Sequence, residues 1–399
     1  MGNTTILEGT KIMDNSQPFI IEEHKPHLGA KIKAIGVGGG GSNMINHMIK
    51  AGVKGIELYV ANTDAQALHT SLAPNKIQLG SKLTKGLGAG MKPDTGKESA
   101  LEAHEEIRAA LEGADIVFIA AGLGGGTGTG AAPVIASIAR ELGILTISVV
   151  TKPFKFEGKK RLKFADAGLE DLKRESDSIV VIPNERLLSV IDRTMGMKDS
   201  FKLVDSVLSN AVTGTSGVIL DTGCGDDINV DFADLRTVMS YKGLALMGMG
   251  DYSGENAPLE ALQMAVESPL LDNLSINGAM GVMVHFQMHP SVSLFEVAGS
   301  MEEVINDAVD EDADVIFGTS VNENLAENQV IVTLVATGFE RTLAVSQGIN
   351  NHNYESTTPR QEEEQVESAQ PAQNIRRVVG GYESDDTLDI PTYLRQQKD

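Results

Sequence analysis

"AAGLGGGTGTGAAP", residues 120–133, carries six glycines and two threonines and not one charged side chain. Glycine at this density lets the backbone approach a bulky ligand and turn its N–H groups toward an anion. A strand predicted at 115–122 runs into this stretch, and a helix predicted at 131–142, with Pro133 in its first turn, begins at its end. We therefore predict an anion-binding loop at the N-terminus of a helix, where the helix dipole adds to the attraction.

Composition restricts the class of protein. The 399 residues are 41% hydrophobic, enough for two sizeable cores, so we expect two domains with polar tails. A net charge of −22 argues against general binding of nucleic acid or anionic membranes, which need a basic surface. We find no apolar run of about 18 residues and no secretory signal, and the single cysteine, Cys224, fits a reducing compartment. The expected location is the cytoplasm, without direct membrane insertion.

The order of apolar runs and helical stretches predicts the fold. Near-continuous apolar strands alternate with helices from residue 31 onward, which is typical of a parallel sheet covered on both faces. We predict a doubly wound α/β domain, whose ligands lie at the carboxyl ends of the strands. The predicted strands are 31–37, 56–62, 115–122, 144–151 and 178–184, and the predicted helices are 43–50, 97–111 and 131–142.

A smaller α+β unit is predicted after a long central helix at 199–220. It has helices at 255–267 and 293–309 and strands at 281–286, 313–320 and 329–338. After Phe339 the chain is rich in Gln, Asn, Glu and Ser, and such a segment buries too little apolar surface to fold alone. The predicted segments are a flexible tail at 1–28, the α/β domain at 29–198, the central helix and loop at 199–228, the α+β domain at 229–338, a disordered linker at 339–387 and a partner-binding peptide at 388–399.

Two further glycine loops, GVGGGGSN at 36–43 and GLGAG at 86–90, accompany the first one. The former fits the dinucleotide pattern G-x-G-x-x-G, a weak signal that a tight strand-to-helix turn would also give. The stretch GMKPDTGKE at 90–98 is not a P-loop, because five residues separate its glycines and Glu98 stands where Ser or Thr binds magnesium. Several glycine loops on neighbouring strand ends favour the polyphosphate of a nucleoside triphosphate. A dinucleotide, and with it an NAD-dependent oxidoreductase, stays the alternative.

Taken in order, these motifs resemble those of the FtsZ family of bacterial tubulin homologues. The stretch GGGTGTGAAP resembles the tubulin signature, and the matching segments run from residue 31 to 338 and through the last twelve residues. They include GVGGGGSN, NTDAQAL, GLGAG, FEGKKR, IPNERLL, NVDFADLRTVM, SPLL and DIPTYLRQQ. The resemblance implies a tubulin/FtsZ-like fold and a GTPase that assembles head to tail into protofilaments of the bacterial division ring at mid-cell. A nucleotide-binding regulator that does not polymerise is the alternative.

The resemblance also assigns contacts with GTP and GDP. Glu157 and Arg161 match ribose and phosphate contacts, although a surface i,i+4 ion pair would explain them too. A carboxylate at Asp205 can accept from N1–H and the exocyclic amine of guanine, which adenine does not offer. The expected contacts are Gly38, Gly39, Gly40, Gly41, Asn43, Gly88, Ala89, Gly90, Gly124, Gly125, Gly126, Thr127, Gly128, Thr129, Gly130, Glu157, Arg161, Asn184, Phe201 and Asp205, with Phe201 packing on the base.

The acids that hydrolysis needs are expected far downstream of the glycine loops. Asn229, Asp231 and Asp234 lie near a loop-to-helix junction, where they would equally serve as an N-cap and first-turn acids. The resemblance implies that this loop enters the nucleotide site of the next subunit and that its carboxylates orient the attacking water. Hydrolysis would then require assembly. Mg²⁺ is expected to offset the phosphate charge, with Asp64 as its candidate ligand.

The C-terminal peptide LDIPTYLRQQKD, at 388–399, is expected to bind membrane tethers and ring regulators. The sequence departs from the family pattern in three places. Lys92 replaces a small polar residue or Asn close to the expected γ-phosphate, the loop at 223–228 is longer and more acidic than usual, and Leu123 replaces a Met. We expect the Leu123 exchange to be silent because it conserves volume. The other two put the hydrolysis rate and the fit of the intersubunit loop in question.

Overall fold

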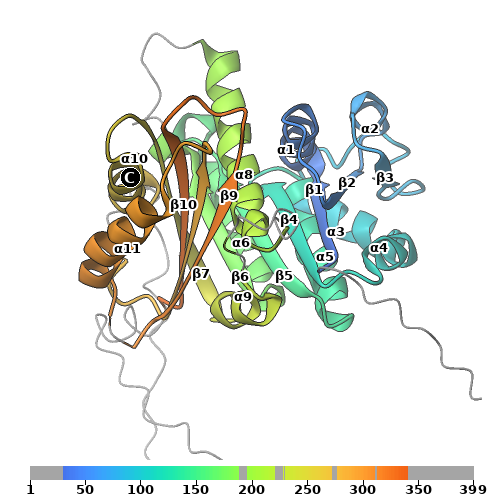
Figure 1. The fold of residues 1–399 in the computed structure, drawn as a ribbon. Helices are drawn as coiled ribbons and strands as arrows, with labels where there is room; N and C mark the ends of the chain where they lie inside the picture. Colours follow the sequence, from blue (N-terminus) through green and yellow to red (C-terminus); the bar gives the residue numbers. More distant parts are fainter. Residues whose placement is uncertain are drawn as a thin grey trace, which may run out of the picture. The chain divides into compact units, whose positions relative to one another are not determined.

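The computed structural model describes residues 30–187, 196–220, 228, 230–271, 276–310 and 312–339. The predicted N-terminal tail, linker and C-terminal peptide lie outside these ranges, except that Phe339 is included. The predicted α/β architecture with a parallel sheet is confirmed (Figure 1).

Six strands form the parallel part of the sheet, in the order β3-β2-β1-β4-β5-β6. Every residue of β1 is buried, and so is every residue of β4 before Gly122, because helices cover both faces. This burial explains the near-continuous apolar runs in the sequence. The strands are β1 (Ile32–Val37), β2 (Ile56–Asn62), β3 (Asn75–Gln78), β4 (Ile116–Gly122), β5 (Leu145–Lys152) and β6 (Ser178–Pro183).

Helices form one apolar core on each face of this sheet. On one face, Met44 and Ile45 of α1 share a core with Leu208 and Val212 of α8. On the other face, α4, α5 and α6 pack in a second core around residues such as Ile135. The helices of this part are α1 (Gly38–Lys50), α2 (Ala65–Thr70), α3 (Pro93–Glu102), α4 (His104–Leu111), α5 (Thr127–Glu141), the 3₁₀ turn η1 (Lys155–Glu157), α6 (Lys159–Glu175), α7 (Asn184–Leu187) and α8 (Met197–Leu220).

The C-terminal part has its own core between four strands and two helices. Figure 1 shows α10 and α11 on one side of these strands and α8 on the other. Strand β10 is antiparallel to both β7 and β8, and β9 pairs with β8 in parallel. The elements are α9 (Phe232–Met239), β7 (Gly243–Ser253), α10 (Ala257–Val266), the 3₁₀ turn η2 (Pro269–Leu271), β8 (Gly281–Met288), α11 (Leu294–Ala308), β9 (Asp314–Val321) and β10 (Gln329–Thr337).

Strand β7, which the sequence did not predict, joins the two parts into one ten-stranded sheet. Its first residues, 243–245, pair in parallel with β6, and its later residues pair with β10. Two glycines inside β7 hid the strand pattern. A Cβ at Gly248 would run into the carbonyl oxygen of Ala265, and a Cβ at Gly250 would run into that of Ala261, so glycine is required where α10 packs on the strand.

The predictions for three helices are corrected by the structure. Helix α1 begins at Gly38 rather than at 43, and α5 begins at Thr127 rather than at 131, because glycine-rich segments wind into the first turns despite their low helix propensity. Pro133 consequently lies inside α5 and not in its first turn. The helix predicted at 97–111 is two helices, α3 and α4, because the backbone at Ala103 leaves the helical region, with φ −95° and ψ 20°.

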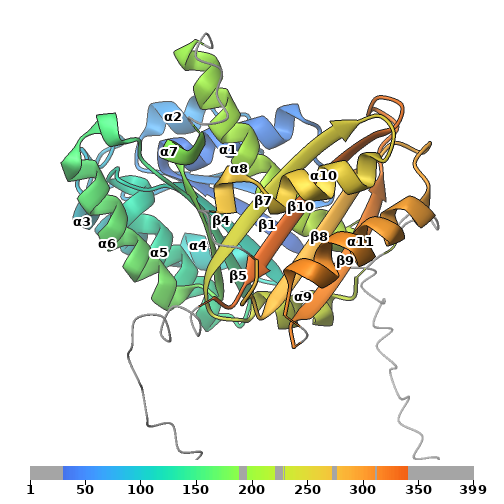
Figure 2. The same cartoon turned by 90° about the vertical axis from the view of Figure 1, so that its left-hand side faces the viewer.

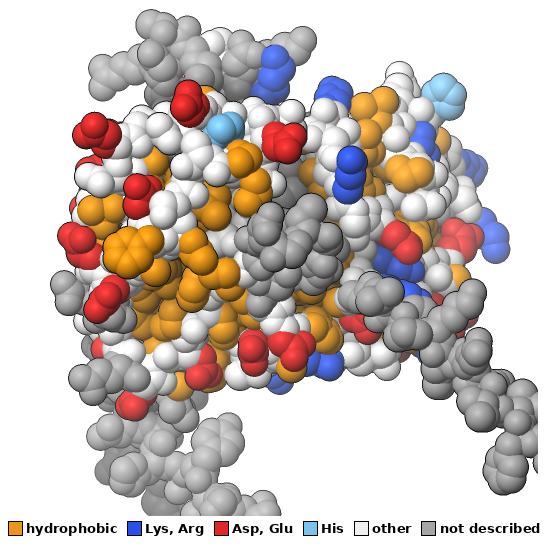
Figure 3. Space-filling model, in the orientation of Figure 1, with side chains coloured by type: hydrophobic (Ala, Val, Ile, Leu, Met, Phe, Trp, Pro, Cys, Tyr) orange, Lys and Arg blue, Asp and Glu red, His pale blue; other side chains and the backbone are white. Residues whose placement is uncertain are grey.

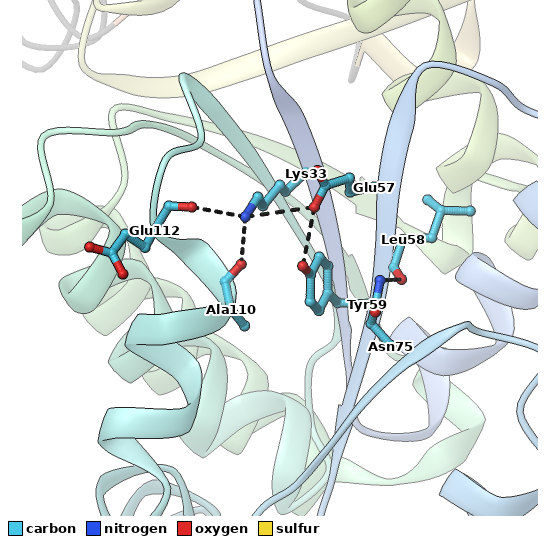
Figure 4. Close-up of polar contacts among 7 residues, drawn as sticks. All are labelled: Lys33, Glu57, Leu58, Tyr59, Asn75, Ala110 and Glu112. Atoms are coloured by element: carbon cyan, nitrogen blue, oxygen red, sulfur yellow. Dashed lines mark hydrogen bonds and ion pairs between the residues drawn. The ribbon is translucent and has the colours of Figure 1, made fainter.

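A buried lysine fastens α4 to the sheet (Figure 4). Lys33 of β1 is 7% exposed, and its ammonium donates to the carbonyl oxygens of Ala110 at 2.8 Å and Glu112 at 3.0 Å. Its third neighbour is the Glu57 carboxylate at 3.7 Å, which also accepts from the Tyr59 hydroxyl at 3.1 Å. The lysine thereby satisfies carbonyls that the end of a helix leaves open.

Charge is unevenly spread over the face drawn in Figure 3. Acidic side chains gather over the C-terminal strands and helices, and most of the lysines and arginines of this face lie over the α1 to α4 side. In the described ranges, no helix combines the length and the apolar character needed to cross a bilayer.

Candidate functional site

The two densest glycine loops meet at the carboxyl ends of the central strands β1 and β4. Strands β1 and β4 are neighbours in register, so the loops that follow Val37 and Gly122 leave the sheet at the same level. The strand order 3-2-1-4-5-6 reverses its direction of growth between β1 and β4, which is where doubly wound sheets bind ligands. The predicted position of the site, at the carboxyl ends of the strands, agrees with this topology.

Glycine is required for the loops to come this close. Gly38 has φ +70°, and a Cβ added there would lie 2.9 Å from the amide nitrogen of Gly128. A Cβ at Gly40 would lie 3.1 Å from the amide nitrogen of Gly122. The first turns of α1 and α5 are thus pressed together over the ends of β1 and β4.

Both helices begin without a side-chain cap and without an acid in the first turn. The first N–H groups of a helix have no partner within the helix, and the dipole makes that end positive. Two such ends side by side are able to attract an anion without a basic side chain. This accounts for the uncharged loop sequence.

The helix ends open into a cavity of about 370 Å³. Elements that are distant in sequence form its walls: α1, the loop before α5, η1 and the start of α6, α7, and α8. Eleven of the expected nucleotide contacts line these walls in the described part of the chain: Gly39, Gly40, Asn43, Gly125, Gly126, Thr127, Gly128, Glu157, Arg161, Asn184 and Asp205.

The glycines of the loops divide into two kinds. A Cβ added at Gly39 or Gly125 would meet no atom of the described chain within 4 Å, so these two leave open space at the cavity. A Cβ at Gly41 would run into the carbonyl oxygen of Ala120, and one at Gly130 into that of Pro93. Gly41 and Gly130 are therefore required by packing between chain segments.

Glu157 and Arg161 form the i,i+4 ion pair that the sequence left as an alternative. The Arg161 guanidinium donates to Glu157 Oε2 at 2.6 Å, and Glu157 Oε1 accepts from the amide of Phe154 at 2.9 Å. The pair also lines the cavity, and the Glu157 side chain is 19% exposed. The ion pair holds both side chains at the cavity wall. The two residues can therefore form this pair and still contact a ligand in the cavity.

At another wall the cavity presents two acceptors. Asn184 is 7% exposed, and its Oδ1 has no hydrogen-bond partner in the described part of the chain. Asp205 lies on α8, and burial raises the pKa of its carboxyl to about 6. An orphaned buried acceptor costs free energy unless a ligand donates to it. Together the two groups fit the donor-rich edge of a guanine base.

Other expected contacts lie beside the cavity or behind its wall. Ala89 is buried against Gly126, where a Cβ added at Gly126 would be 2.8 Å from Ala89 Cβ. The Thr129 hydroxyl is buried and accepts from the amide of Gly124 at 2.9 Å. Eight expected contacts do not line the cavity: Gly38, Gly41, Gly88, Ala89, Gly90, Gly124, Thr129 and Gly130. Phe201 belongs to α8, and the structure does not describe its side chain.

The candidate metal ligand, Asp64, is the N-cap of α2. Its Oδ1 accepts from the amides of Gln66 at 2.9 Å and Ala67 at 3.1 Å, and it does not line the cavity. In the described ranges, no group of three His, Cys, Asp or Glu side chains could hold a metal ion. Mg²⁺ usually binds through one or two carboxylates together with substrate phosphates and water, a mode that needs no such group.

The two predicted catalytic acids lie at the amino ends of the parallel strands, opposite to the carboxyl ends where the cavity lies. Asp231 is the N-cap of α9, where it accepts from the amide of Ala233 at 3.4 Å, and Asp234 is in the first turn. Helix α9 precedes β7, which runs parallel to β6, whereas Asn184 follows the carboxyl end of β6. Figure 2 shows α7 and α9 at opposite ends of the strands.

Both acids are exposed, and the third predicted residue, Asn229, lies outside the described residues. From Asp205 at the cavity, α8 continues for fifteen residues to Leu220, which is about 22 Å at 1.5 Å per residue. One chain therefore does not bring Asp231 or Asp234 to its own cavity.

Sequence reasoning missed several wall residues. Thr151 lies near the end of β5 and Pro153 directly follows that strand, and Val204 and Leu208 come from α8. Thr151 could have been found, because it ends a predicted strand at the edge where ligands were expected. Another missed contact joins the Thr63 hydroxyl to the Thr127 hydroxyl at 2.7 Å, which ties the loop after β2 to the first residue of α5.

Two protein-family models match the chain. The model of the tubulin/FtsZ family GTPase domain matches residues 31–192, and the model of the FtsZ family C-terminal domain matches residues 243–340. The stretch between the two matches contains α8, which carries Asp205 at the cavity, and α9, which begins next to Asp231 and carries Asp234.

Solved structures share the fold over most of the chain. An FtsZ dimer of M. jannaschii, described as empty, is 46% identical and covers 78% of this chain and 89% of that one, with a TM-score of 0.74. A point mutant of M. jannaschii FtsZ is also 46% identical, covering 78% and 91%, with a TM-score of 0.73. CetZ2 from Haloferax volcanii, as a GTPγS-bound protofilament, is 20% identical over 79% and 96%, with a TM-score of 0.66, and shows the fold alone. The chain thus belongs to the tubulin/FtsZ family, with a GTP-hydrolysing domain followed by the C-terminal domain of the FtsZ type.

Proposed function

We propose that this GTPase polymerises head to tail and that each active site is completed by the neighbouring subunit. The observation that carries the proposal is that the cavity lies at the carboxyl ends of the parallel strands, whereas Asp231 and Asp234 lie at their amino ends. A GTP-loaded monomer holds its nucleotide far from its own acids. A second copy stacked on the carboxyl edge of the sheet would bring its acids to that nucleotide.

The same placement accounts for filaments. Two different surfaces meet in such a contact, so a pair of subunits still has one surface of each kind free for further neighbours. A contact of this heterologous kind forms an open filament when its rotation does not close a ring. The FtsZ dimer of M. jannaschii supports self-association of the family as the basis of this assembly.

Each part of the proposed site has a chemical role. The N–H groups at the start of α1 and α5, around Gly39 and Gly125, bind the phosphates, and Asp205 with Asn184 binds guanine. Mg²⁺ held by phosphate oxygens and water offsets charge that the uncharged loops do not. The neighbour's Asp231 and Asp234 hold the attacking water in line, which is adequate because phosphoryl transfer depends chiefly on positioning and electrostatics.

In the cell, the proposed polymer is the division ring at mid-cell, in the cytoplasm. This part of the proposal rests on the likeness to FtsZ and on the peptide at 388–399, through which membrane tethers and ring regulators would bind. In this proposal the tethers provide the connection to the membrane.

GTP turnover per molecule, measured against protein concentration, tests the shared site. Turnover should rise above a threshold concentration at which light scattering also rises. D234A should bind GTP and lose most of its turnover, whereas E296A, which removes an exposed first-turn acid of α11, should retain it. Turnover that does not change with concentration would contradict the shared site.

Mixing two inactive variants gives a sharper test. D205A should be impaired in its own cavity but keep its acids, and D234A keeps its cavity but lacks one acid. At a contact between the D234A cavity and the D205A acids, both halves of the site are intact. The mixture should therefore recover turnover that neither variant has alone, and no recovery at any mixing ratio would refute hydrolysis across the contact.

A further inference from the structure

The backbone just before the two acids is hydrogen-bonded to Thr319 of the edge strand β9. Strand β9 is the last strand in the sheet order and pairs with β8 on one side. On its other side, the Thr319 amide donates to the carbonyl oxygen of Ile228 at 3.0 Å. The amide of Ile228 donates in return to Thr319 Oγ1 at 2.9 Å.

This attachment is built into the sheet. Thr319 is 1% exposed, so its hydroxyl exchanges no hydrogen bond with bulk water. The neighbouring Gly318 makes room for the segment, because a Cβ there would lie 3.2 Å from the carbonyl oxygen of Ile228. Two residues after Ile228, the amide of Val230 donates to the carbonyl oxygen of Val218 in α8 at 3.3 Å.

The acids follow at once. Asp231 is three residues from Ile228 and is the N-cap of α9, and the amide of Asp234 donates to its carbonyl oxygen at 3.1 Å. Both residues are exposed, and the Asp231 carboxylate accepts from the amide of Ala233 within α9 itself, so this contact moves with the helix. Their position depends on the backbone before α9 and on α9 itself, which packs against β8 and β9 (Figure 2).

We propose that Thr319 is a positioning residue for hydrolysis, whose hydroxyl holds the backbone of Ile228 and thereby aims Asp231 and Asp234 at the nucleotide of the next subunit. The inference rests on the proposed shared site. A displacement of about 1 Å in a catalytic group is enough to cost about a hundredfold in rate. A threonine that touches neither nucleotide nor water can therefore control turnover.

The variants T319V and T319S separate the hydroxyl from the volume. T319V keeps the shape but removes the acceptor for the Ile228 amide, and T319S keeps the acceptor. T319V should lower kcat at least tenfold while its affinity for GDP stays within twofold of the wild type, and T319S should restore most of kcat. T333V, at a buried threonine of β10 in the same part of the molecule, is the matched control and should keep wild-type turnover.

Mixing experiments distinguish positioning from general damage. T319V has an intact cavity, so it should recover turnover when mixed with D205A, whose acids and Thr319 are intact. It should not recover turnover with D234A, because both variants are defective on the same face. A T319V protein that is simply misfolded would be rescued by neither.

The outcomes are separable from those of the proposed function. If D205A and D234A do not complement each other, the shared site is wrong whatever T319V does. If they do complement, wild-type turnover in T319V, or rescue of T319V by D234A, overturns the role of Thr319. Equal losses in T319V and T333V would overturn it as well.

Discussion

His285 should make the folded protein lose stability in mild acid. The side chain lies on β8, is 4% exposed, and has no partner for Nε2 in the described residues. Its ring packs on α8 so closely that a Cβ at Gly217 would lie 2.8 Å from its Cε1. Of the described residues that line the adjoining cavity of about 470 Å³, Lys54 alone is charged. Burial in these surroundings lowers the pKa of His285 to about 4.

The size of the effect follows from the two pKa values. An unfolded histidine titrates near 6.5, so between about 6.5 and 4 the unfolded chain binds a proton that the folded protein does not. The free energy of unfolding therefore falls as the pH drops through this window. At about 1.36 kcal/mol per pH unit, the full loss is about 3 kcal/mol, and about 2 kcal/mol of it is reached at pH 5.

The assay is urea unfolding at pH 7.5 and pH 5.0 for the wild type and H285Q. Asp205 acts in the opposite direction in the same window, because its raised pKa lets the folded state take up a proton below about pH 6. The informative quantity is therefore the difference between the two proteins, in which Asp205 cancels. The wild type should lose about 2 kcal/mol more than H285Q. H69Q, which removes an exposed histidine, is the control, and equal losses in wild type and H285Q would refute the reasoning.

Three further predictions follow from the site and the core. In the proposed site guanine donates to the ionised Asp205 carboxylate, so the Kd for GDP should rise about tenfold between pH 7 and pH 5, and D205N should bind weakly at both. G125A should weaken GDP binding at least tenfold without changing the urea midpoint of the nucleotide-free protein, whereas G130A should lower that midpoint, because its Cβ meets backbone. K33M should lower the free energy of unfolding by about 2–3 kcal/mol, because two carbonyls lose a charged donor, and a loss below about 0.5 kcal/mol would contradict that role.

Much of the fold could be predicted because the parallel strands are buried on both faces. The apolar run at β4 is one example, since no position in it has to face water. Strand β7 could not be predicted, because contact with α10 requires glycine at 248 and 250 and removes the residues that mark a strand. The early starts of α1 and α5 were missed for a related reason: glycine is chosen there for close approach against its helix propensity.

The candidate site was predictable in parts that lie close in sequence. The loops at 36–43 and 122–130 could each be predicted from nearby residues, because glycines follow a strand and precede a helix in both. The open positions, Gly39 and Gly125, cannot be told from the packing positions, Gly41 and Gly130, without knowing which segments they face. The partner that requires glycine is Ala120, 79 residues from Gly41, in one case and Pro93, 37 residues from Gly130, in the other, and a single sequence does not specify these contacts.

The placement of the acids depends on contacts that are even more distant. Arg236 of α9 donates to the carbonyl oxygen of Gly143, at the amino end of β5, at 3.1 Å. Thr337 of β10 donates to the carbonyl oxygen of Val238 at 2.8 Å, and Thr319 holds Ile228. These hydrogen bonds join residues 91 to 99 positions apart and attach α9 to both parts of the sheet. Because α9 is fastened on both sides, the C-terminal strands cannot shift against the parallel strands without breaking one of these bonds or moving the acids.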